Sequence, residues 1–567
     1  MSRKLLEKLR DRYAAETGLN APGSGSLRIA LVYPNGYGQA MANLGYQSVY
    51  QLFNAHPDCC CERFFLPDKE DLLEHEKSGL PLVSLETASP LSEFGLIALS
   101  VSFENDYLNL PKIFELGQVP LFAAQRSQQD PLVLFGGVCA FLNPEPLAEI
   151  ADIVAVGEAE PILPGFIPAL KAYFAASNSG LETFNKLPGI YLPSQVEIRY
   201  QEDGFLAAIS AFPVRRIYLE DLDDSASRSF ILNKEAEFGE MALTEVMRGC
   251  SRGCRFCAAG YIYLPPRERS LGNLLEQVDE GLCQRERIGL VGAAVADHTR
   301  ITELQQEIMT RGGEVSVSSL RLDALTQAEA VQLQAAGLKT VAIAPEAGSQ
   351  RMRDLINKNL AEEQILHAVQ LLADAGLMNI KLYFLIGLPT ESDEDLDAIL
   401  QLADKVRLVW REVGRTRGRL GSLTLSVNPF IPKPFTPMQW AGMEGEKSLK
   451  KKIRKLQAGV SRLPNTELIS ESIRSSQLQA LLARADRRIG RLLPEIAAGG
   501  NLGQILKRNN LNLDFYVTRD RGEHEVFPWE VIDQGNHRSY LWQEYQKGLQ
   551  GQLTPRCFAE CTRCGIC

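Results

Sequence analysis

The stretch Met247-Arg-Gly-Cys-Ser-Arg-Gly-Cys-Arg-Phe-Cys257 decides how the rest of this chain is interpreted. It gathers Cys250, Cys254 and Cys257 in the spacing C-x3-C-x2-C, directly after an apolar run at residues 242–247. Thiolates this close together, in a chain without secretory features, indicate soft metal ligands rather than disulfide partners. Three thiolates are one short of a closed iron–sulfur or zinc site. The spacing therefore predicts a metal centre with one open coordination position, just past the end of a strand.

Length and composition set the outer limits. The chain has 567 residues, of which 45% are hydrophobic and 23% charged, with a formal net charge of −10. We expect several domains of roughly 150 residues each. No apolar run reaches the ~18 residues of a membrane helix, and the N-terminus lacks the apolar core of a secretory signal. These features predict a cytoplasmic protein with no membrane partner. The negative charge disfavours a uniformly basic nucleic-acid surface and leaves a local basic groove open.

An α/β pattern follows a short charged helix and a Pro-Gly-Ser linker in residues 1–26. Short apolar runs alternate with segments of helical spacing, for example residues 40–53. Such alternation predicts a parallel, doubly wound sheet over residues 27–183, with ligand-binding loops at the carboxyl ends of its strands. The strand-like runs are residues 29–33, 96–102, 132–135 and 153–156.

Six further strand–helix units can be counted in residues 241–437. Helical runs separate most of the strands, as in residues 271–285 and 362–375. Repeated units of this length predict a parallel, partial (β/α)6 barrel that carries its function at the carboxyl ends of its strands. The expected strands lie near residues 242–247, 289–296, 314–320, 339–344, 379–386 and 422–427. The flanking parts are a connecting segment at 184–240, a mostly helical region at 438–554 and a Cys-rich tail at 555–567.

With Phe256 before its third cysteine, the pattern C-x3-C-x-aromatic-C resembles the signature of radical S-adenosylmethionine (SAM) enzymes. The resemblance implies a [4Fe–4S] cluster on Cys250, Cys254 and Cys257, SAM on the fourth iron, and Phe256 near the adenine. The first α/β domain, with its Phe-Gly-Gly-Val and Val-Gly-Glu-Ala-Glu stretches, resembles the cobalamin-binding domain that precedes many such barrels. The best match is a subgroup of cobalamin-domain radical SAM proteins without an assigned reaction.

The same resemblance assigns further residues to SAM binding. It implies that Arg321 and Glu346, at successive strand ends, contact the SAM carboxylate and ribose; an internal Arg321–Glu346 pair is the alternative. Gly292 stands where the family meets the SAM amino group, but the family's acidic residue is missing, and Asp297 or His298 could replace it. The implied cofactor-binding set is Phe256, Gly292, Ser318, Arg321, Glu346, Ile386 and Gly387.

Cobalamin binding is left open by the sequence. The Asp-x-His-x-x-Gly element, whose histidine can ligate cobalt in the family, is absent, and His56 and His75 do not stand in that context. A domain that keeps the fold without the cofactor is an equal alternative. Any bound cobalamin would lack an axial histidine from that motif and rest on backbone near four residues whose small side chains allow close approach. These four are Ser102, Gly136, Gly137 and Gly157.

The chain closes with Cys557, Cys561, Cys564 and Cys567, spaced C-x3-C-x2-C-x2-C. Four thiolates are enough to close a metal site. The compact spacing suits a second [4Fe–4S] cluster better than a four-cysteine zinc finger, whose two pairs are usually well separated. Zinc and free thiols remain alternatives.

The predicted function is that of a radical SAM enzyme that cleaves SAM reductively and modifies an unidentified substrate, for example by methylation or by modification of RNA or protein. It implies a reductant such as flavodoxin or ferredoxin. Basic runs at residues 447–455 and 484–491 give nucleic acid weak support as a partner. The alternatives are a non-catalytic iron–sulfur and SAM-binding regulatory module, and a zinc-dependent nucleic-acid-binding protein.

Overall fold

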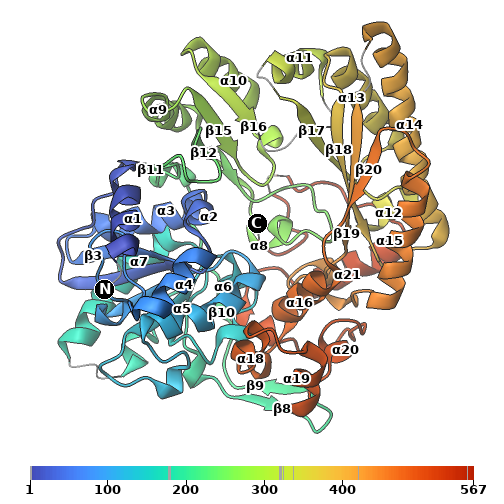
Figure 1. Cartoon of the computed structure of the whole chain (residues 1–567). Helices are drawn as coiled ribbons and strands as arrows, with labels where there is room; N and C mark the ends of the chain where they lie inside the picture. The colour runs from blue at the N-terminus through green and yellow to red at the C-terminus, as the bar shows by residue number, and fades with distance from the viewer. Residues whose placement is uncertain are drawn as a thin grey trace.

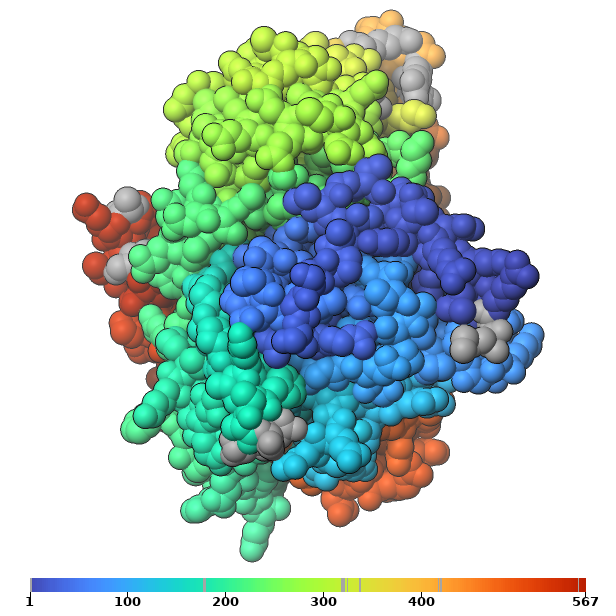
Figure 2. Space-filling model, turned by 90° about the vertical axis from the view of Figure 1, so that its left-hand side faces the viewer, coloured from blue at the N-terminus to red at the C-terminus, as the bar shows by residue number. Residues whose placement is uncertain are grey.

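The computed structural model describes residues 3–176, 180–317, 322–323, 325–335, 338–418, 421–558 and 560–566. In Figure 1 the N-terminal α/β domain lies beside and below the barrel strands, and the C-terminal helices fill the space beneath the barrel next to that domain. Figure 2 shows, from the side, the barrel above the N-terminal domain, with green segments of the chain between them. None of the helices in the described ranges is long and apolar enough to cross a membrane.

The N-terminal domain is built on one six-stranded sheet in the order β3-β2-β4-β5-β6-β7. All neighbouring strands are parallel except β7, which runs antiparallel to β6. This topology confirms the predicted doubly wound sheet, and its first five strands have the flavodoxin-like order. The strands are β2 (Leu27–Tyr33), β3 (Cys59–Phe65), β4 (Leu96–Ser100), β5 (Leu132–Gly136), β6 (Ile153–Ala155) and β7 (Ile190–Tyr191).

Alternate residues of these strands enter two different cores. Leu31 of β2 packs with α3 (Leu44–Ala55) and α7 (Ala159–Ala175) on one face of the sheet. Its neighbour Val32 packs with α5 (Leu110–Gly117) on the other face. Because both faces are covered by helices, the strands are apolar throughout, which is typical of parallel sheets.

The barrel consists of two parallel sheets in the described residues, β12-β15-β16 and β17-β18-β19-β20. The first six strands agree with the six predicted ones. The seventh, β20 (Thr466–Ile469), pairs in parallel with β19, so the sheet continues into the region that the sequence placed among helices. The predicted six are β12 (Ala242–Glu245), β15 (Arg287–Val291), β16 (Glu314–Val317), β17 (Thr340–Glu346), β18 (Asn379–Ile386) and β19 (Ser422–Pro429).

Strand β18 illustrates how the side chains of a barrel strand are divided between its two faces. Ile380 and Phe384 are buried against the outer helices, whereas Lys381 and Tyr383, on the other face, remain partly accessible. The strand thus keeps an apolar outer face under helices and a more polar face toward the barrel interior. The barrel helices are α9 (Leu271–Leu282), α10 (Ile301–Thr310), α11 (Gln327–Ala335), α12 (Gln350–Leu355), α13 (Glu362–Asp374), α14 (Asp393–Arg417) and α15 (Glu446–Val460).

The C-terminal helices join the two domains into one core. Helix α16 packs on the 3-10 segment Glu104–Asn109 of the N-terminal domain, and α21 packs on α12 of the barrel. The C-terminus then returns to the centre of the molecule beside α8 (Figure 1). The helices are α16 (Ile473–Arg484), α17 (Arg487–Gly490), α18 (Leu493–Ala497), α19 (Leu502–Arg508), α20 (Leu513–Tyr516) and α21 (Arg538–Leu549).

The remaining elements are short. In the connecting segment, β8 and β9 form an antiparallel hairpin, and β11 pairs with β1 next to the N-terminal helix. The other strands are β1 (Thr17–Gly18), β8 (Ile198–Tyr200), β9 (Leu206–Ile209), β10 (Val214–Arg215), β11 (Ile231–Leu232), β13 (Met247–Arg248), β14 (Arg267–Glu268) and β21 (Ile532–Asp533). The other helices are α1 (Arg3–Ala14), α2 (Tyr37–Met41), α4 (Lys69–Ser78), α6 (Val138–Leu142) and α8 (Ala259–Ile262).

Candidate active site

The cysteine loop, residues 249–258, connects β13 to α8 just beyond the carboxyl end of β12. Strand β13 pairs antiparallel with β14, so two short strands brace the base of the loop. Gly249 has a φ of +82°, and a Cβ there would lie 2.6 Å from the Tyr263 carbonyl oxygen. Because only glycine fits this turn, the Arg-Gly-Cys sequence bends the chain sharply before its first thiol.

Cys250, Cys254 and Cys257 are partly buried and form no disulfide. Burial raises the pKa of all three thiols, to about 12 for Cys254. Backbone N–H groups act against this, since Arg252 donates to Cys250 and Gly260 donates to Cys257. The thiols are therefore protonated in the bare chain, and a bound cation would hold them as thiolates.

Asp297 and His298 do not stand free for a ligand. Arg252, inside the cysteine loop, makes hydrogen bonds of 2.6 and 2.7 Å to the Asp297 carboxylate. His298 is 3% exposed, and its Nε2 lies 3.0 Å from the Arg269 carbonyl oxygen. The sequence offered these two residues as substitutes for a missing acidic SAM contact. In the structure Asp297 orients the cysteine loop, and His298 braces the strand end next to it.

Glu346 lies where β17 changes register against β18, with a φ of +66°. Its carboxylate lies 3.3 Å from Lys358 Nζ, and burial raises its pKa even so. A non-glycine residue in this conformation, carrying a perturbed carboxyl group, is typical of a functional site. The same Lys358 charge lowers the pKa of the three loop thiols, which places Glu346 and Lys358 beside the cysteine loop. The predicted alternative partner, Arg321, lies outside the described residues.

The other residues predicted to contact SAM lie in different settings. Ile386 is buried at the end of β18, and the Gly387 N–H donates to Glu391 at 2.8 Å, so that amide is already engaged. Phe256 packs against the main core from within the cysteine loop. Ser318, like Arg321, lies outside the described residues. Their contacts with SAM stay predictions.

A cavity of about 450 Å³ lies between the N-terminal domain and the barrel. On one side it meets Asn43 and Ser102, which follow β2 and β4, at the switch point where doubly wound sheets bind ligands. On the other side it reaches Gly249 and Ala259, at the two ends of the cysteine loop, and Gly292 after β15. The carboxyl ends of both sheets therefore open toward one interdomain cavity.

The glycines that line this cavity are explained by the fold. A Cβ at Gly137 would lie 2.5 Å from the Val101 carbonyl oxygen, and one at Gly157 would lie 2.0 Å from that of Ile217. Their positive φ values and close contacts are made with neighbouring backbone. These contacts alone require glycine at both positions, and the contact of Gly136, Gly137 and Gly157 with a cofactor stays a prediction. Gly136 has no such constraint.

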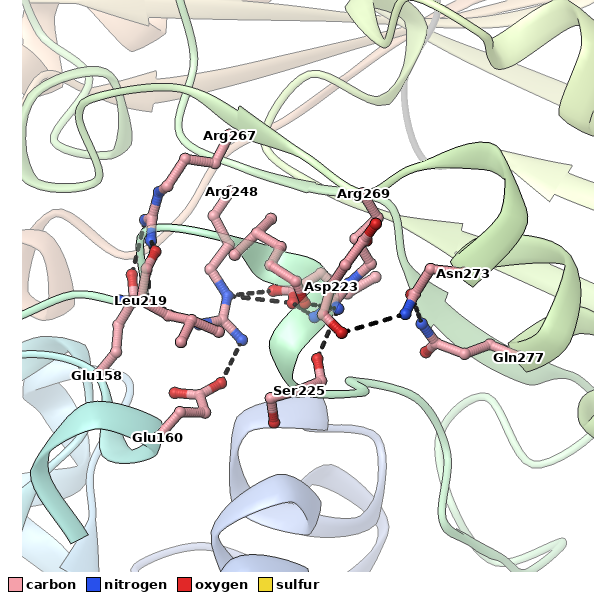
Figure 3. A network of polar contacts seen from close by, with 12 residues as sticks. Glu158, Glu160, Leu219, Asp223, Ser225, Arg248, Arg267, Arg269, Asn273 and Gln277 are labelled. Carbon is pink, nitrogen blue, oxygen red and sulfur yellow. Dashed lines mark hydrogen bonds and ion pairs between the residues drawn. The ribbon is translucent and has the colours of Figure 1, made fainter. Parts of the chain in front are cut away.

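A buried ion network joins the two domains beside the cavity (Figure 3). Arg248, directly before the cysteine loop, donates to Glu158 at 2.8 Å and to Glu160 at 2.7 Å. Arg267 of β14 donates to the same Glu158 at 2.7 and 3.0 Å. Glu245 accepts from Arg248 in turn. The Gly-Glu-Ala-Glu stretch after β6 is thus a clamp that fixes the base of the cysteine loop to the N-terminal domain.

Comparison with known proteins places this site in a family. A family model described as radical SAM proteins, N-terminal, matches residues 45–193, and one described as the radical SAM superfamily matches residues 244–403. An uncharacterized protein of Methanocaldococcus jannaschii is 30% identical over 502 residues, which cover 87% of this chain and 97% of that protein.

The chain belongs to the radical SAM superfamily. It is a radical SAM enzyme, as the cysteine spacing predicted. The anaerobic magnesium-protoporphyrin IX monomethyl ester cyclase of Rubrivivax gelatinosus is 26% identical over 296 residues, 49% of this chain and 50% of the cyclase. Among solved structures, the radical SAM methyltransferase TsrM of Kitasatospora setae is 14% identical with a TM-score of 0.47, covering 93% of this chain and 96% of its own.

Membership of the superfamily implies a [4Fe–4S] cluster and SAM. The cysteine loop fits the cluster chemically, because it presents three thiols and directs backbone N–H groups at two of the sulfurs. Among the described residues, no group of three or more His, Cys, Asp or Glu side chains is already placed to hold a metal ion.

The last segment of the chain, residues 551–567, contains the Cys-rich stretch 555–567 and is called the tail from here on. It contacts the cysteine loop. Cys557, Cys561 and Cys564 line one small cavity together with Cys250. Cys567, the fourth predicted ligand, lies outside the described residues. The metal site predicted here stays a prediction, and the structure shows that three of its four cysteines lie beside Cys250.

Sequence reasoning missed the residues that hold the cysteine loop from a distance. Arg255 is fully buried and donates to Glu544 and to the Gln552 carbonyl oxygen. Asn357, with a φ of +54°, donates to the Gly253 carbonyl oxygen at 3.1 Å. The Asn-Lys-Asn run at 357–359 predicts a local turn, but no local pattern predicts its contact with a loop about a hundred positions earlier.

Proposed function

We propose that Cys250, Cys254 and Cys257 hold a [4Fe–4S] cluster, and that SAM binds beside it at the barrel mouth. When bound, the cluster supplies the electron for reductive cleavage of SAM. The observation that carries this proposal is the cysteine loop itself, in which three partly buried thiols lie at the carboxyl end of the barrel strands and two of them receive backbone hydrogen bonds. A small one-electron carrier such as flavodoxin or ferredoxin would reduce the site.

Glu346 and Lys358 are the described side chains best placed to receive SAM. The ionised Glu346 offers an acceptor for the ribose hydroxyls, and Lys358 offers a cation for the SAM carboxylate. Their 3.3 Å pairing would open when the ligand binds. Phe256 supplies an apolar surface within the loop for the adenine.

The interdomain cavity is the proposed place of the substrate or of a second cofactor. It touches the cysteine loop, and its walls are mostly apolar, with Ser100, Ser102 and Asn43 as neutral polar points and the charged groups of the ion network around Arg248 on one side. None of the described residues that line it is a histidine. A corrinoid bound there would therefore carry no histidine on cobalt, and protein purified with cobalamin supplied should show no corrinoid or a base-off, histidine-off spectrum. A cobalt signal with histidine nitrogen splitting would contradict this proposal.

The experiment that tests the main proposal is anaerobic reconstitution with iron and sulfide, followed by reduction with dithionite in the presence of SAM. We expect 5′-deoxyadenosine, detected by chromatography. Glu346→Gln should weaken SAM binding, measured by equilibrium dialysis, while the iron content stays that of the parent. A fully loaded protein that neither binds nor cleaves SAM would contradict the proposal.

A further inference from the structure

The tail buries two of its thiols although its described residues have almost no core of their own. Cys561 is 3% exposed and Cys564 is 4% exposed. Apart from these two, Thr554 is the one buried residue among the described tail positions, which contain no helix or strand. Phe558, by contrast, is 64% exposed. A segment that leaves its aromatic side chain in solvent and turns its thiols inward is organised around the thiols.

The tail thiols line a cavity that they share with the cysteine loop, and a bound metal would have to draw them closer, since no group of three or more such side chains in the described residues is already placed to hold a metal ion. Cys557, Cys561 and Cys564 line a cavity of about 30 Å³ with Cys250 and Gly253. The cavity is small, and what points to a metal is its set of donors, because several thiols on one cavity are the ligands of soft metals and iron–sulfur clusters. The Arg563 Nε lies 3.1 Å from the Cys561 sulfur, so a cation from the tail itself faces this sulfur.

Backbone hydrogen bonds fasten the tail to the loop on both sides of this cavity. The Cys557 N–H donates to the Ser251 carbonyl oxygen at 2.8 Å. The Asn357 amide bridges the two segments, since it donates to the carbonyl oxygens of Gly253 and Thr554 and accepts from the Thr554 N–H at 2.9 Å. These bonds lie within three residues of Cys250 or Cys254, so ordering of the tail is transmitted directly to the loop.

Two arginines and two aspartates tie the same segments by charge. Arg556, next to Cys557, donates to Asp323 at 2.7 Å, and its other nitrogen lies 3.7 Å from Asp297. Arg252, within the cysteine loop, pairs with Asp297 and lies 3.6 Å from Asp323. The positions next to cysteines in both segments therefore share the same two carboxylates.

We propose that Cys557, Cys561 and Cys564 bind a second, thiolate-ligated metal centre, an iron–sulfur cluster, and that its loading stiffens the cysteine loop and helps it to retain the first cluster. The inference rests on the proposed function only in taking the cysteine loop as the first cluster site. Metal orders a segment that lacks a core, and that segment is bonded to Ser251 and Gly253. The two metal sites are therefore thermodynamically coupled, and each loading favours the other.

The test uses the full chain and three variants, reconstituted anaerobically with iron and sulfide. The double variant Cys561→Ser/Cys564→Ser removes thiols and keeps every backbone contact of the tail. Truncation after Pro555 keeps Thr554, with its bonds to Asn357, and removes all tail thiols. Cys283→Ser is the matched control, because Cys283 is an exposed free thiol away from both sites. The readouts are iron, sulfide and zinc content, and hydrogen exchange of the amides of residues 250–257.

We expect the double variant and the truncation each to lose about four irons and four sulfides relative to the control, and their loop amides to exchange faster. Loss of about one zinc and no iron would keep the site and overturn the iron–sulfur occupant. Unchanged metal content in both variants would overturn the proposal, whatever happens to SAM cleavage. Changed metal content with unchanged loop exchange would overturn the coupling. Since none of these readouts depends on SAM, failure here is distinguishable from failure of the proposed function.

Discussion

The cysteine loop and the tail both bring closely spaced thiols to one place, but the chain supports them differently. The loop lies between β13 and α8, with buried charged groups beneath it and backbone N–H groups directed at its sulfurs. The tail has neither helix nor strand in its described residues and meets the rest of the chain through a few hydrogen bonds. The comparison shows that sequence spacing identifies both sets of cysteines but does not tell how each is supported. The surrounding strands and helices hold the thiols of the loop in place, whereas we propose that a bound metal orders the thiols of the tail.

The largest effect on stability is expected at Arg255, because its side chain supports both the loop and the tail. It is fully buried and donates to Glu544 and to the Gln552 carbonyl oxygen at 2.7 Å. Arg255→Met should lower the free energy of unfolding by about 3 kcal/mol, because it leaves a buried carboxylate with one cation fewer. Urea unfolding would measure the loss, with Arg199→Met, at an exposed pair, as the control. Equal stability of the two variants would show that the loop is not supported in this way.

A smaller effect is expected at the interdomain clamp. Glu158→Gln removes the charge that faces Arg248 and Arg267 while it keeps the side-chain shape. We expect a loss of about 2 kcal/mol, since hydrogen bonds to charged groups contribute that much, together with faster amide exchange around Gly249. Glu280→Gln, at a more exposed ion pair, should show neither change. If the clamp variant retains full stability, the N-terminal domain does not fix the base of the loop.

The smallest effect concerns Glu346 and pH. Burial raises the pKa of this carboxyl group above its ordinary 4.5, although Lys358 opposes the shift. The folded chain thus binds the proton more tightly than the unfolded chain, so the free energy of unfolding falls as pH rises from about 4.5 through the raised pKa. Glu346→Gln should flatten that slope and leave the protein at least as stable at neutral pH.

Urea unfolding at pH 5 and pH 8 would measure the slope, with the exposed Glu314→Gln as the control. An unchanged slope would show that the Glu346 carboxyl group does not lower the free energy of unfolding as pH rises. An unchanged SAM affinity of the Glu346→Gln variant would show that this carboxylate does not bind SAM.

Much of the fold could be predicted because it depends on local patterns. The runs that became β2, β4, β5 and the barrel strands are mainly apolar segments, several of them bounded by glycine or proline, and their alternation with helices fixes a parallel sheet. The strand β20 was missed because its short, exposed Thr-Glu-Leu-Ile sequence gains its place only by pairing with β19. Pairing of this kind is a tertiary effect that local propensity does not contain.

The site was predictable to the same depth. The cysteine spacing predicted three candidate metal ligands, but it did not predict that Asp297 bonds to Arg252 or that His298 bonds to the Arg269 backbone. Nor did it predict that the Ile217 backbone, about sixty residues later, requires glycine at Gly157. Partners that far along the chain are set by packing and cannot be deduced from spacing.

The central claim is that the cysteine loop alone holds the cluster that cleaves SAM. The most direct measurement compares 5′-deoxyadenosine formation by the reconstituted, dithionite-reduced wild type with that of two variants. These are Cys250→Ala/Cys254→Ala/Cys257→Ala and Cys561→Ser/Cys564→Ser. We predict that the loop variant loses one four-iron cluster and forms no product, whereas the tail variant still binds SAM and forms product. Undiminished 5′-deoxyadenosine from the loop variant would contradict the account.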